Sequence, residues 1–308
     1  MSWKRHGVAA VDETFEVETR HYSGWSLTTD GSDVPCYVMN GCAFAPAGVT
    51  AELISVGDRL DPNVDVAGKT VVFDLRCGPV LSGSAAGSVS DYVYNPSGVM
   101  AAGTFGGQGG PAPSNFPAPF YEAADRGAVG FVAILAGRDA DDDRFFADPT
   151  VRVHPRIPGV FLSASVGREF VDSLSDRASR SATLTVTGTA RTSTSGNIVG
   201  HVAGQKPDAI VVNTHHDGGW SGAVQDAAGV AAVMGLAAFY SRFPSNYIQK
   251  DLYFVIDGSH YAWNYPCGAN KFTEMHPGVL ERMCLAIGSS TLASGSSGTM
   301  EISSTPVR

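Results

Sequence analysis

The chain has 308 residues, of which 44% are hydrophobic and 17% are charged, so it can bury a full core and has room for two domains. Its formal net charge is −9 and its lysines and arginines are scattered, which argues against nucleic acid as a partner. Because no run of about 18 apolar residues is present and the first residues lack the apolar core of a signal peptide, we expect no membrane span and a cytoplasmic location.

The five cysteines are odd in number and contain no Cys-x-x-Cys pair, which makes a zinc ribbon very improbable. They are Cys36, Cys42, Cys77, Cys267 and Cys284. A disulfide between Cys36 and Cys42 is one alternative. Reduced, buried thiols are the other, and we expect the thiols.

We take residues 1–39 as an N-terminal segment that precedes the first regular pattern. Residues 47–60 and 69–76 then alternate or cluster β-branched and apolar residues between Gly, Pro and Asp turns, which predicts two strands. Residues 103–119 are so rich in Gly and Pro that no regular structure is expected there.

The next part of the chain, up to residue 190, predicts two helices and three strands. Residues 121–135 predict a short helix that ends at Gly127 and is followed by a buried strand. Residues 157–174 predict a strand and then a capped helix, and residues 181–190 alternate as a strand does. A β-rich α+β domain over residues 40–190 is therefore expected.

Three sequences in this region resemble the protease-associated domain, a β-rich module inserted in several peptidase families. They are GKTVVFDLR, ADRGAVGFVAIL and IPGVFLSASVGREFVDSL, in that order and at suitable spacing. The resemblance covers about residues 40–190. The alternative is an unrelated α+β domain with the same distribution of turns.

The pattern changes after this module. Residues 195–204, 208–217 and 251–261 predict strands with nearly continuous apolar runs, and residues 226–243 predict a helix. Strands of this kind that alternate with helices indicate a parallel sheet sandwiched by helices. We therefore predict an α/β domain with a parallel-rich sheet over residues 191–308.

Metal-ligating side chains follow the predicted strands at the point where each strand ends. His215 and Asp217 end one strand, His260 ends another, and Asp226 opens the helix between them. In such sheets functional residues lie at the carboxyl ends of the strands, and imidazole and carboxylate groups are ligands that suit zinc. The alternative is a hydrogen-bonded turn followed by an aspartate that caps the helix.

Each of these residues has an expected role at the site. His215 is the natural ligand, and Asp217, two residues later, returns to the same face of the strand, where its carboxylate could orient that ligand. Asp226 could bridge two cations. His216 is expected to point the other way, because side chains alternate along a strand.

The spacing of these residues resembles the di-zinc aminopeptidase family. Its marks here are His215-x-Asp217, the segment GAVQDAAGV with Asp226 eleven positions after His215, and VIDGSH at the end of the next strand. The resemblance implies a zinc-exopeptidase-like fold, zinc as cofactor, and a peptide or small amide as substrate. Members of this family often carry a protease-associated insertion and are often secreted.

The sequence departs from the family where the resemblance implies Asp-Gly-Glu-Glu, because it has Asp257-Gly258-Ser259-His260. The first glutamate is the family's general base, and Ser259 has no pKa near neutrality with which to replace it. His260 can replace the second glutamate as a ligand. We therefore expect one zinc site, and two at most, formed by His215, Asp226 and His260, with Asp217 and His260 as the candidate catalytic residues.

The downstream part lacks further groups that the resemblance implies. Ser289 and Ser290 stand where a carboxylate is expected, and no histidine follows His276. Residues 289–308 are rich in Ser, Thr and Gly and predict a flexible or exposed tail. The predicted catalytic sheet is therefore incomplete.

Three functions remain open at this point. The chain is a metallohydrolase that cleaves an amide bond with metal-activated water, or an impaired relative that binds a peptide or partner. The third alternative is a family member that uses another base, either His260 or Glu274. Nothing in the sequence indicates the oligomeric state.

Overall fold

The computed structural model describes residues 8–76, 80–81, 105–106, 113, 115–136, 153–175, 180–218, 227–260, 268–290 and 301–305. The chain divides into two compact units. One consists of Met1–Thr19 and Arg191–Arg308, and the other of Arg20–Ala190. We call them the outer-chain unit and the inserted unit.

The outer-chain unit is built on a mixed sheet. From one edge its strands are β14 (Glu301–Thr305), β13 (Met283–Ser290), β11 (Lys206–His215), β12 (Lys250–Asp257) and β10 (Ser181–Val202), which also pairs with β1 (Ala9–Thr29). β11 is parallel to both of its neighbours, whereas β10 and β14 run antiparallel to theirs. The predicted parallel sheet thus forms the centre, and the edges are antiparallel.

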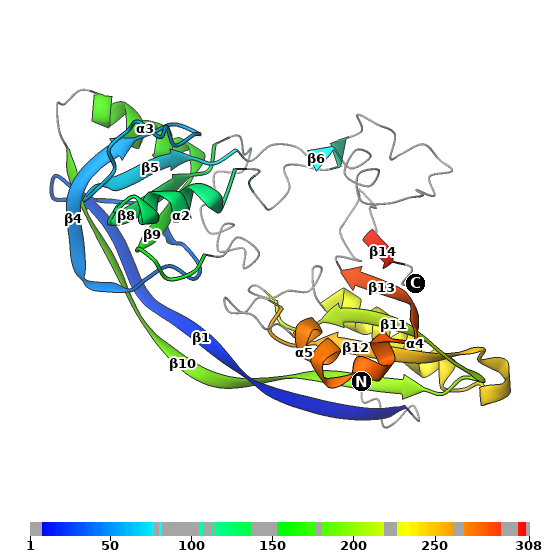
Figure 1. The fold of residues 1–308 in the computed structure, drawn as a ribbon. Helices are drawn as coiled ribbons and strands as arrows, with labels where there is room; N and C mark the ends of the chain where they lie inside the picture. The colour runs from blue at the N-terminus through cyan, green and yellow to red at the C-terminus, as the bar shows by residue number, and fades with distance from the viewer. Residues whose placement is uncertain are drawn as a thin grey trace. The chain divides into compact units, whose positions relative to one another are not determined.

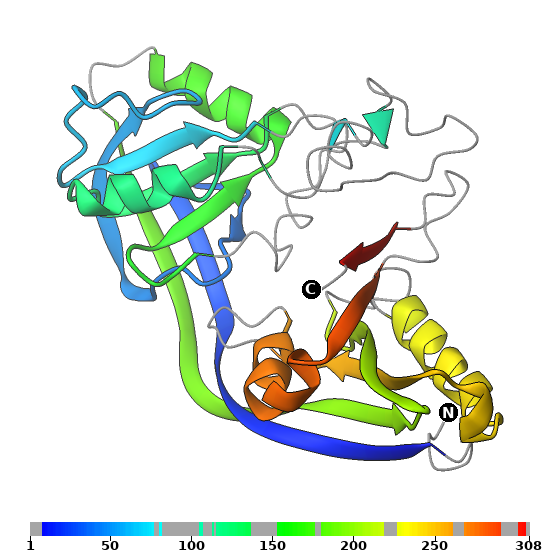
Figure 2. The same ribbon diagram turned by 45° about the vertical axis from the view of Figure 1, so that its right-hand side comes forward.

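Helices cover both faces of this sheet, as Figures 1 and 2 show for α4 and α5. They are α4 (Ala228–Tyr240), α5 (Gly268–Met275) and α6 (Pro277–Leu280), and a short 3-10 helix, η4 (Ser245–Tyr247), follows α4. Neighbouring side chains of β11 point to opposite faces of the sheet. Val212 packs in one apolar cluster with Val233 of α4, and Val211 packs in another with Phe272 of α5. The predicted α/β class is confirmed.

The inserted unit is rich in short strands. They are β2 (Ser32–Val34), β3 (Tyr37–Val38), β4 (Ala45–Ser55), β5 (Thr70–Asp74), β8 (Gly130–Ile134) and β9 (Gly159–Leu162), with a separate pair β6 (Val80–Leu81) and β7 (Phe105–Gly106). The strands β4, β5, β8 and β9 are parallel in that order. The apolar runs of β5, β8 and β9 are buried almost throughout, as in a sheet covered on both faces, whereas β4 is exposed or half-buried at most positions.

Two helices complete the inserted unit, α2 (Ala118–Asp125) and α3 (Ala164–Ser175). Phe131 of β8 packs on Phe120 of α2, with their ring centroids 5.5 Å apart. On the other face of the same strand, a Cβ at Gly167 of α3 would lie only 2.2 Å from Cγ2 of Ile134, so only glycine permits this approach. One continuous apolar core results.

Several expectations about the elements were wrong. β10 is one strand through residues 181–202, although two strands were expected, and β1 was not predicted. The inserted unit, Arg20–Ala190, contains the predicted domain of residues 40–190 and begins before it, because β1 and β10 run on from the outer-chain unit into it. Whether this unit is a protease-associated domain stays a prediction.

The tail expected over residues 289–308 was also partly wrong, because residues 301–305 form β14. This strand pairs with β13 so that Ile302 lies opposite Ser289. Strand pairing satisfies backbone groups whatever the side chains are, and a composition rich in Ser and Thr therefore did not reveal it.

The cysteines that the structure describes agree with the expectation of thiols. Cys36 and Cys42 do not form a disulfide. Burial raises the pKa of the Cys42 thiol to about 11, which keeps it protonated at neutral pH. Within the described residues, no helix has both the length and the apolar character that a membrane crossing requires.

Candidate functional site

The candidate site lies where the central strands end. His215, the last residue of β11, is in register with Asp257, the last residue of β12. On the other side of β11, Asn213 is in register with Gly288 of β13. Three parallel strands therefore end at one edge, which is where functional groups of such sheets lie.

His215 and His260 lie against each other at this edge. Their ring centroids are 4.2 Å apart and the ring planes are 14° from parallel. His215 is 5% exposed. The structure thus brings together two of the three predicted ligands, from the ends of two neighbouring strands.

The orientation of His215 is fixed by Asp217. Nδ1 of His215 donates to the backbone carbonyl oxygen of Asp217 over 2.9 Å, because a carbonyl oxygen can only accept. The nearest carboxylate oxygen of Asp217 is 3.8 Å from the same nitrogen. A proton on Nδ1 leaves the Nε2 lone pair of the neutral ring for a metal.

Asp257 is an ionisable group inside the sheet edge. Its side chain is 3% exposed, and burial raises its pKa to about 7. A hydrogen bond with the Asn213 side chain acts in the opposite direction, and the negative charge of Asp217 adds to the rise. Among the described residues, no hydrogen-bond partner lies at its Oδ1. Asp257 can therefore hold or release a proton near neutral pH.

Ser259 occupies an unusual backbone conformation in the turn after β12. Its φ is +59°, in the left-handed region that non-glycine residues seldom adopt, and it is 8% exposed. Such residues persist where the surrounding structure holds them, often at functional sites. The hydroxyl of Ser259 supplies no carboxylate at the position where the family resemblance implies a base.

The third predicted ligand, Asp226, lies outside the described residues. Within the described ranges, no group of three or more His, Cys, Asp or Glu side chains is placed to hold a metal ion. The start of α4 nevertheless packs on the site edge: a Cβ at Gly229 would lie 2.4 Å from Oγ1 of Thr214 and 2.7 Å from the carbonyl oxygen of Ser289. Imidazole nitrogen suits zinc, and because its lone pair lies in the ring plane, the two near-parallel rings would have to turn to share one ion.

Other sequence candidates lie elsewhere or lack the expected chemistry. Glu274, the alternative base, pairs with Lys271 on α5 over 2.7 Å. Nε2 of His216 lies 3.0 Å from the carbonyl oxygen of Gly196, so this ring packs toward β10, as strand alternation predicted. Ser289 is 9% exposed at the end of β13 and offers no carboxylate.

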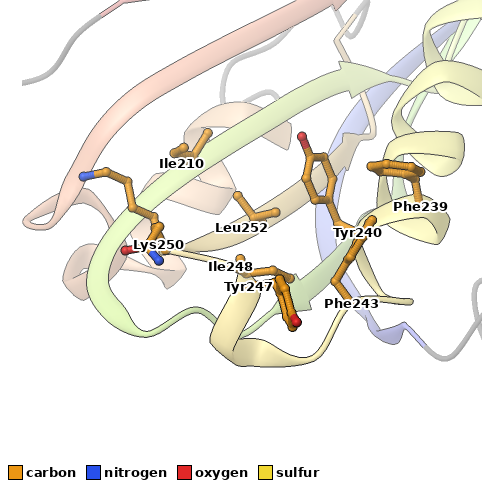
Figure 3. Close-up of a pocket in the computed structure, with 9 residues that line it drawn as sticks. Ile210, Phe239, Tyr240, Phe243, Tyr247, Ile248, Lys250 and Leu252 are labelled. Carbon is orange, nitrogen blue, oxygen red and sulfur yellow. The ribbon is translucent and has the colours of Figure 1, made fainter.

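A pocket of about 390 Å³ opens at the opposite end of β12 (Figure 3). Its walls are mainly the apolar and aromatic side chains of α4, η4 and the first residues of β12, among them Phe239, Tyr247, Ile248 and Leu252. Lys250 begins β12 and lines this pocket, whereas Asp257 ends the strand at the candidate site. The pocket is therefore not part of the site.

The fold has clear counterparts among solved structures. A peptidase precursor from Shewanella amazonensis superposes with a TM-score of 0.64 and 18% identity over 94% of this chain and 63% of its own. An aminopeptidase from an Aneurinibacillus species superposes with a TM-score of 0.62 and 17% identity over 94% of this chain and 62% of its own. For a zinc aminopeptidase from Bacillus subtilis the TM-score is 0.61 and the identity 17%, over 94% of this chain and 60% of the other.

The chain has the zinc aminopeptidase fold. The chain spans less than two thirds of the length of each of these structures, and at 17–18% identity the likeness concerns the fold alone. No family model matches the sequence, and no curated protein matches it.

Two contributors to the site of this aminopeptidase fold were missed by sequence reasoning. Asn197 is fully buried in β10, and its side chain bonds to Gly258 and Gly268. The second contributor is Asp257, whose raised pKa depends on its burial beside β11. An asparagine inside the apolar run SGNIVGHV was the available signal for Asn197, because a buried amide requires partners.

Proposed function

We propose that the chain is a zinc-dependent hydrolase of amide or peptide bonds, with the metal held by His215, His260 and Asp226. The observation that carries the proposal is that the rings of His215 and His260 lie with their centroids 4.2 Å apart at the carboxyl edge of the sheet. The hydrogen bond at Nδ1 of His215 supports it, because that bond leaves Nε2 for the metal. Asp226 is included because of its position in the sequence, eleven residues after His215.

The residues around this pair have distinct tasks in the proposed reaction. Zinc, when bound, supplies Lewis acidity that activates water and polarises the amide carbonyl. Asp217 orients His215 through its backbone carbonyl. Asp257 is the group that can hold a proton near neutral pH, because burial raises its pKa to about 7.

The proposed activity is weak compared with that of a site that holds a carboxylate base. Losing a positioned general base removes roughly 10² to 10⁴ of a rate enhancement. Ser259 stands where the family resemblance implies that base, and Ser289 lies at the strand end where it implies a further carboxylate. We therefore propose a peptide or small amide substrate that is turned over slowly.

Hydrolysis of aminoacyl p-nitroanilides with added zinc tests this proposal. The chain is compared with His215→Ala, with Ser259→Glu, and with His154→Ala as a control at an exposed histidine of the inserted unit. We expect slow turnover that His215→Ala abolishes, that Ser259→Glu raises by 10-fold or more, roughly, and that His154→Ala leaves unchanged. Turnover that survives His215→Ala contradicts the proposal.

A second candidate is a relative that binds peptides without cleaving them. Ser259 favours it, because a buried hydroxyl with no pKa near neutrality occupies the position of the base. Calorimetric binding of a peptide that stays intact, by a chain that shows no turnover with zinc, would select this peptide-binding candidate.

We further propose that residues 40–190 are a protease-associated module, between an N-terminal segment and the metal-binding domain of residues 191–308.

A further inference from the structure

Asn197 joins two backbone segments beside the candidate site. Its side chain is 0% exposed. Oδ1 accepts a hydrogen bond from the backbone N–H of Gly258 over 3.1 Å, and Nδ2 donates to the carbonyl oxygen of Gly268 over 2.8 Å. One amide thus ties the turn after β12 to the first residue of α5.

The two joined segments also bond directly to each other and pack closely. The N–H of Gly268 donates to the carbonyl oxygen of Gly258 over 2.8 Å. A Cβ at Gly268 would lie 2.3 Å from Oδ1 of Asn197 and 2.4 Å from the carbonyl oxygen of Gly258. Because such distances are too short for any Cβ, position 268 requires glycine for this contact to form.

The same turn is held from the side of β11. The backbone N–H of His216 donates to the carbonyl oxygen of Asp257 over 2.9 Å. The ring nitrogen Nε2 of His216 lies 3.0 Å from the carbonyl oxygen of Gly196, the residue before Asn197. A Cβ at Gly258 would lie 2.4 Å from that carbonyl oxygen. Gly258 is therefore fixed between β10 and α5, two residues before His260.

We infer that Asn197 is a positioning residue, whose amide fixes the turn after β12 and thereby sets the ring of His260 against the ring of His215. The left-handed backbone of Ser259 lies within this turn and is held by the same bonds. The consequence for zinc affinity rests on the proposed function. The consequence for the two imidazole rings does not.

The test compares Asn197→Ala with Val199→Ala, a truncation of a side chain on the same strand that is 6% exposed. Nuclear magnetic resonance of the zinc-free chain reports the ring signals of His215 and His260 and the hydrogen exchange of the Gly258 amide. We expect Asn197→Ala to shift both ring signals and to speed exchange at Gly258, because the acceptor of that amide is lost. Val199→Ala should leave all three unchanged.

A second pair of variants tests the same contact if Asn197→Ala does not fold. Gly268→Ala places a Cβ against Oδ1 of Asn197, whereas Gly278→Ala in α6 meets no heavy atom within 4 Å. The inference predicts shifted rings in Gly268→Ala only. Ring signals that stay in place in both Asn197→Ala and Gly268→Ala, or that move equally in the controls, would overturn it.

Zinc affinity completes the experiment. If the intact chain binds zinc, Asn197→Ala should raise the dissociation constant by roughly 10-fold to 100-fold, as changes next to metal ligands do, and Val199→Ala should not. If the intact chain does not bind zinc, the proposed function fails while the ring signals still decide the role of Asn197. Shifted rings with unchanged zinc affinity would overturn the link from Asn197 to the metal.

Discussion

The two units differ in what they bury. The inserted unit has one apolar core, and its buried polar side chains among the described residues are the hydroxyl groups of Thr29, Thr70 and Ser163. Among the described residues, the outer-chain unit buries the carboxyl groups of Glu13 and Asp257 and the imidazole of His215, whereas the inserted unit buries the thiol of Cys42. Buried ionisable groups lower stability unless they are paired, and they gather where chemistry needs them. The difference indicates a structural core in one unit and a chemical site in the other.

The largest expected effect is a loss of stability in the inserted unit. Phe131→Ala should lower the free energy of unfolding by about 3–5 kcal/mol, because its ring packs against Phe73, Phe116 and Phe120 and a cavity would remain. Urea unfolding measures this loss. Zinc affinity at 10 °C, well below the unfolding transition, should stay unchanged, and a parallel loss of affinity would remove the distinction between the units.

The next effect is the pH dependence of stability due to Asp257. The pKa of Asp257 is raised from 3.8 to about 7 in the folded chain, so between about pH 4 and pH 7 the folded state keeps a proton that the unfolded state releases. Stability should therefore fall as pH rises through this window, by up to about 4 kcal/mol for a shift of this size. Asp257→Asn should lack this fall.

Thermal unfolding of the zinc-free chain and of Asp257→Asn, from pH 4 to pH 8 with a chelator, checks the sign. Relative to the unmodified chain, Asp257→Asn should become more stable toward unfolding as pH rises. Curves that stay parallel across the range would show that the carboxyl group is not buried as described.

The third effect concerns zinc. Replacing either ring, in His215→Ala or His260→Ala, should weaken zinc binding by roughly 100-fold or more, because each removes a ligand rather than a group that orients one. Isothermal titration measures the affinity. His154→Ala in the inserted unit is the control, and equal binding by all three variants would place the metal elsewhere.

The smallest effect concerns the backbone of Ser259. Ser259→Gly should raise the free energy of unfolding by about 1 kcal/mol, because glycine adopts a φ of +59° without steric strain. Ser259→Ala removes the same hydroxyl and keeps the strain, so it should give no such gain. Chemical unfolding of both variants separates the two contributions, and equal stability of the two would show that the turn holds no strain.

The sequence predicted the elements whose burial shows as a local run of apolar residues. β11, α4 and β12 were expected because their apolar runs are nearly continuous. β1 was missed because much of it is exposed or half-buried, so its partners are not marked by hydrophobic residues. Pairing between distant segments depends on backbone groups, which every residue carries.

The candidate site was predicted to a similar extent. The pairing of His215 with His260 was expected because parallel strands end at one edge. The bonds of Asn197 to residues 61 and 71 positions away were not, because no local pattern links an asparagine to two distant glycines. The place of Asp226 stays a prediction.

One feature of β1 and β10 bears on how such a chain can be built. Glu13 contacts Gly196, and Thr19 bonds to Ser193 over 3.0 Å and to the carbonyl oxygen of Arg191 over 3.3 Å, so the two strands run antiparallel. The whole inserted unit therefore leaves and rejoins the outer chain at neighbouring positions of one hairpin. In terms of chain connectivity, the inserted unit occupies the place of the loop in a β-hairpin.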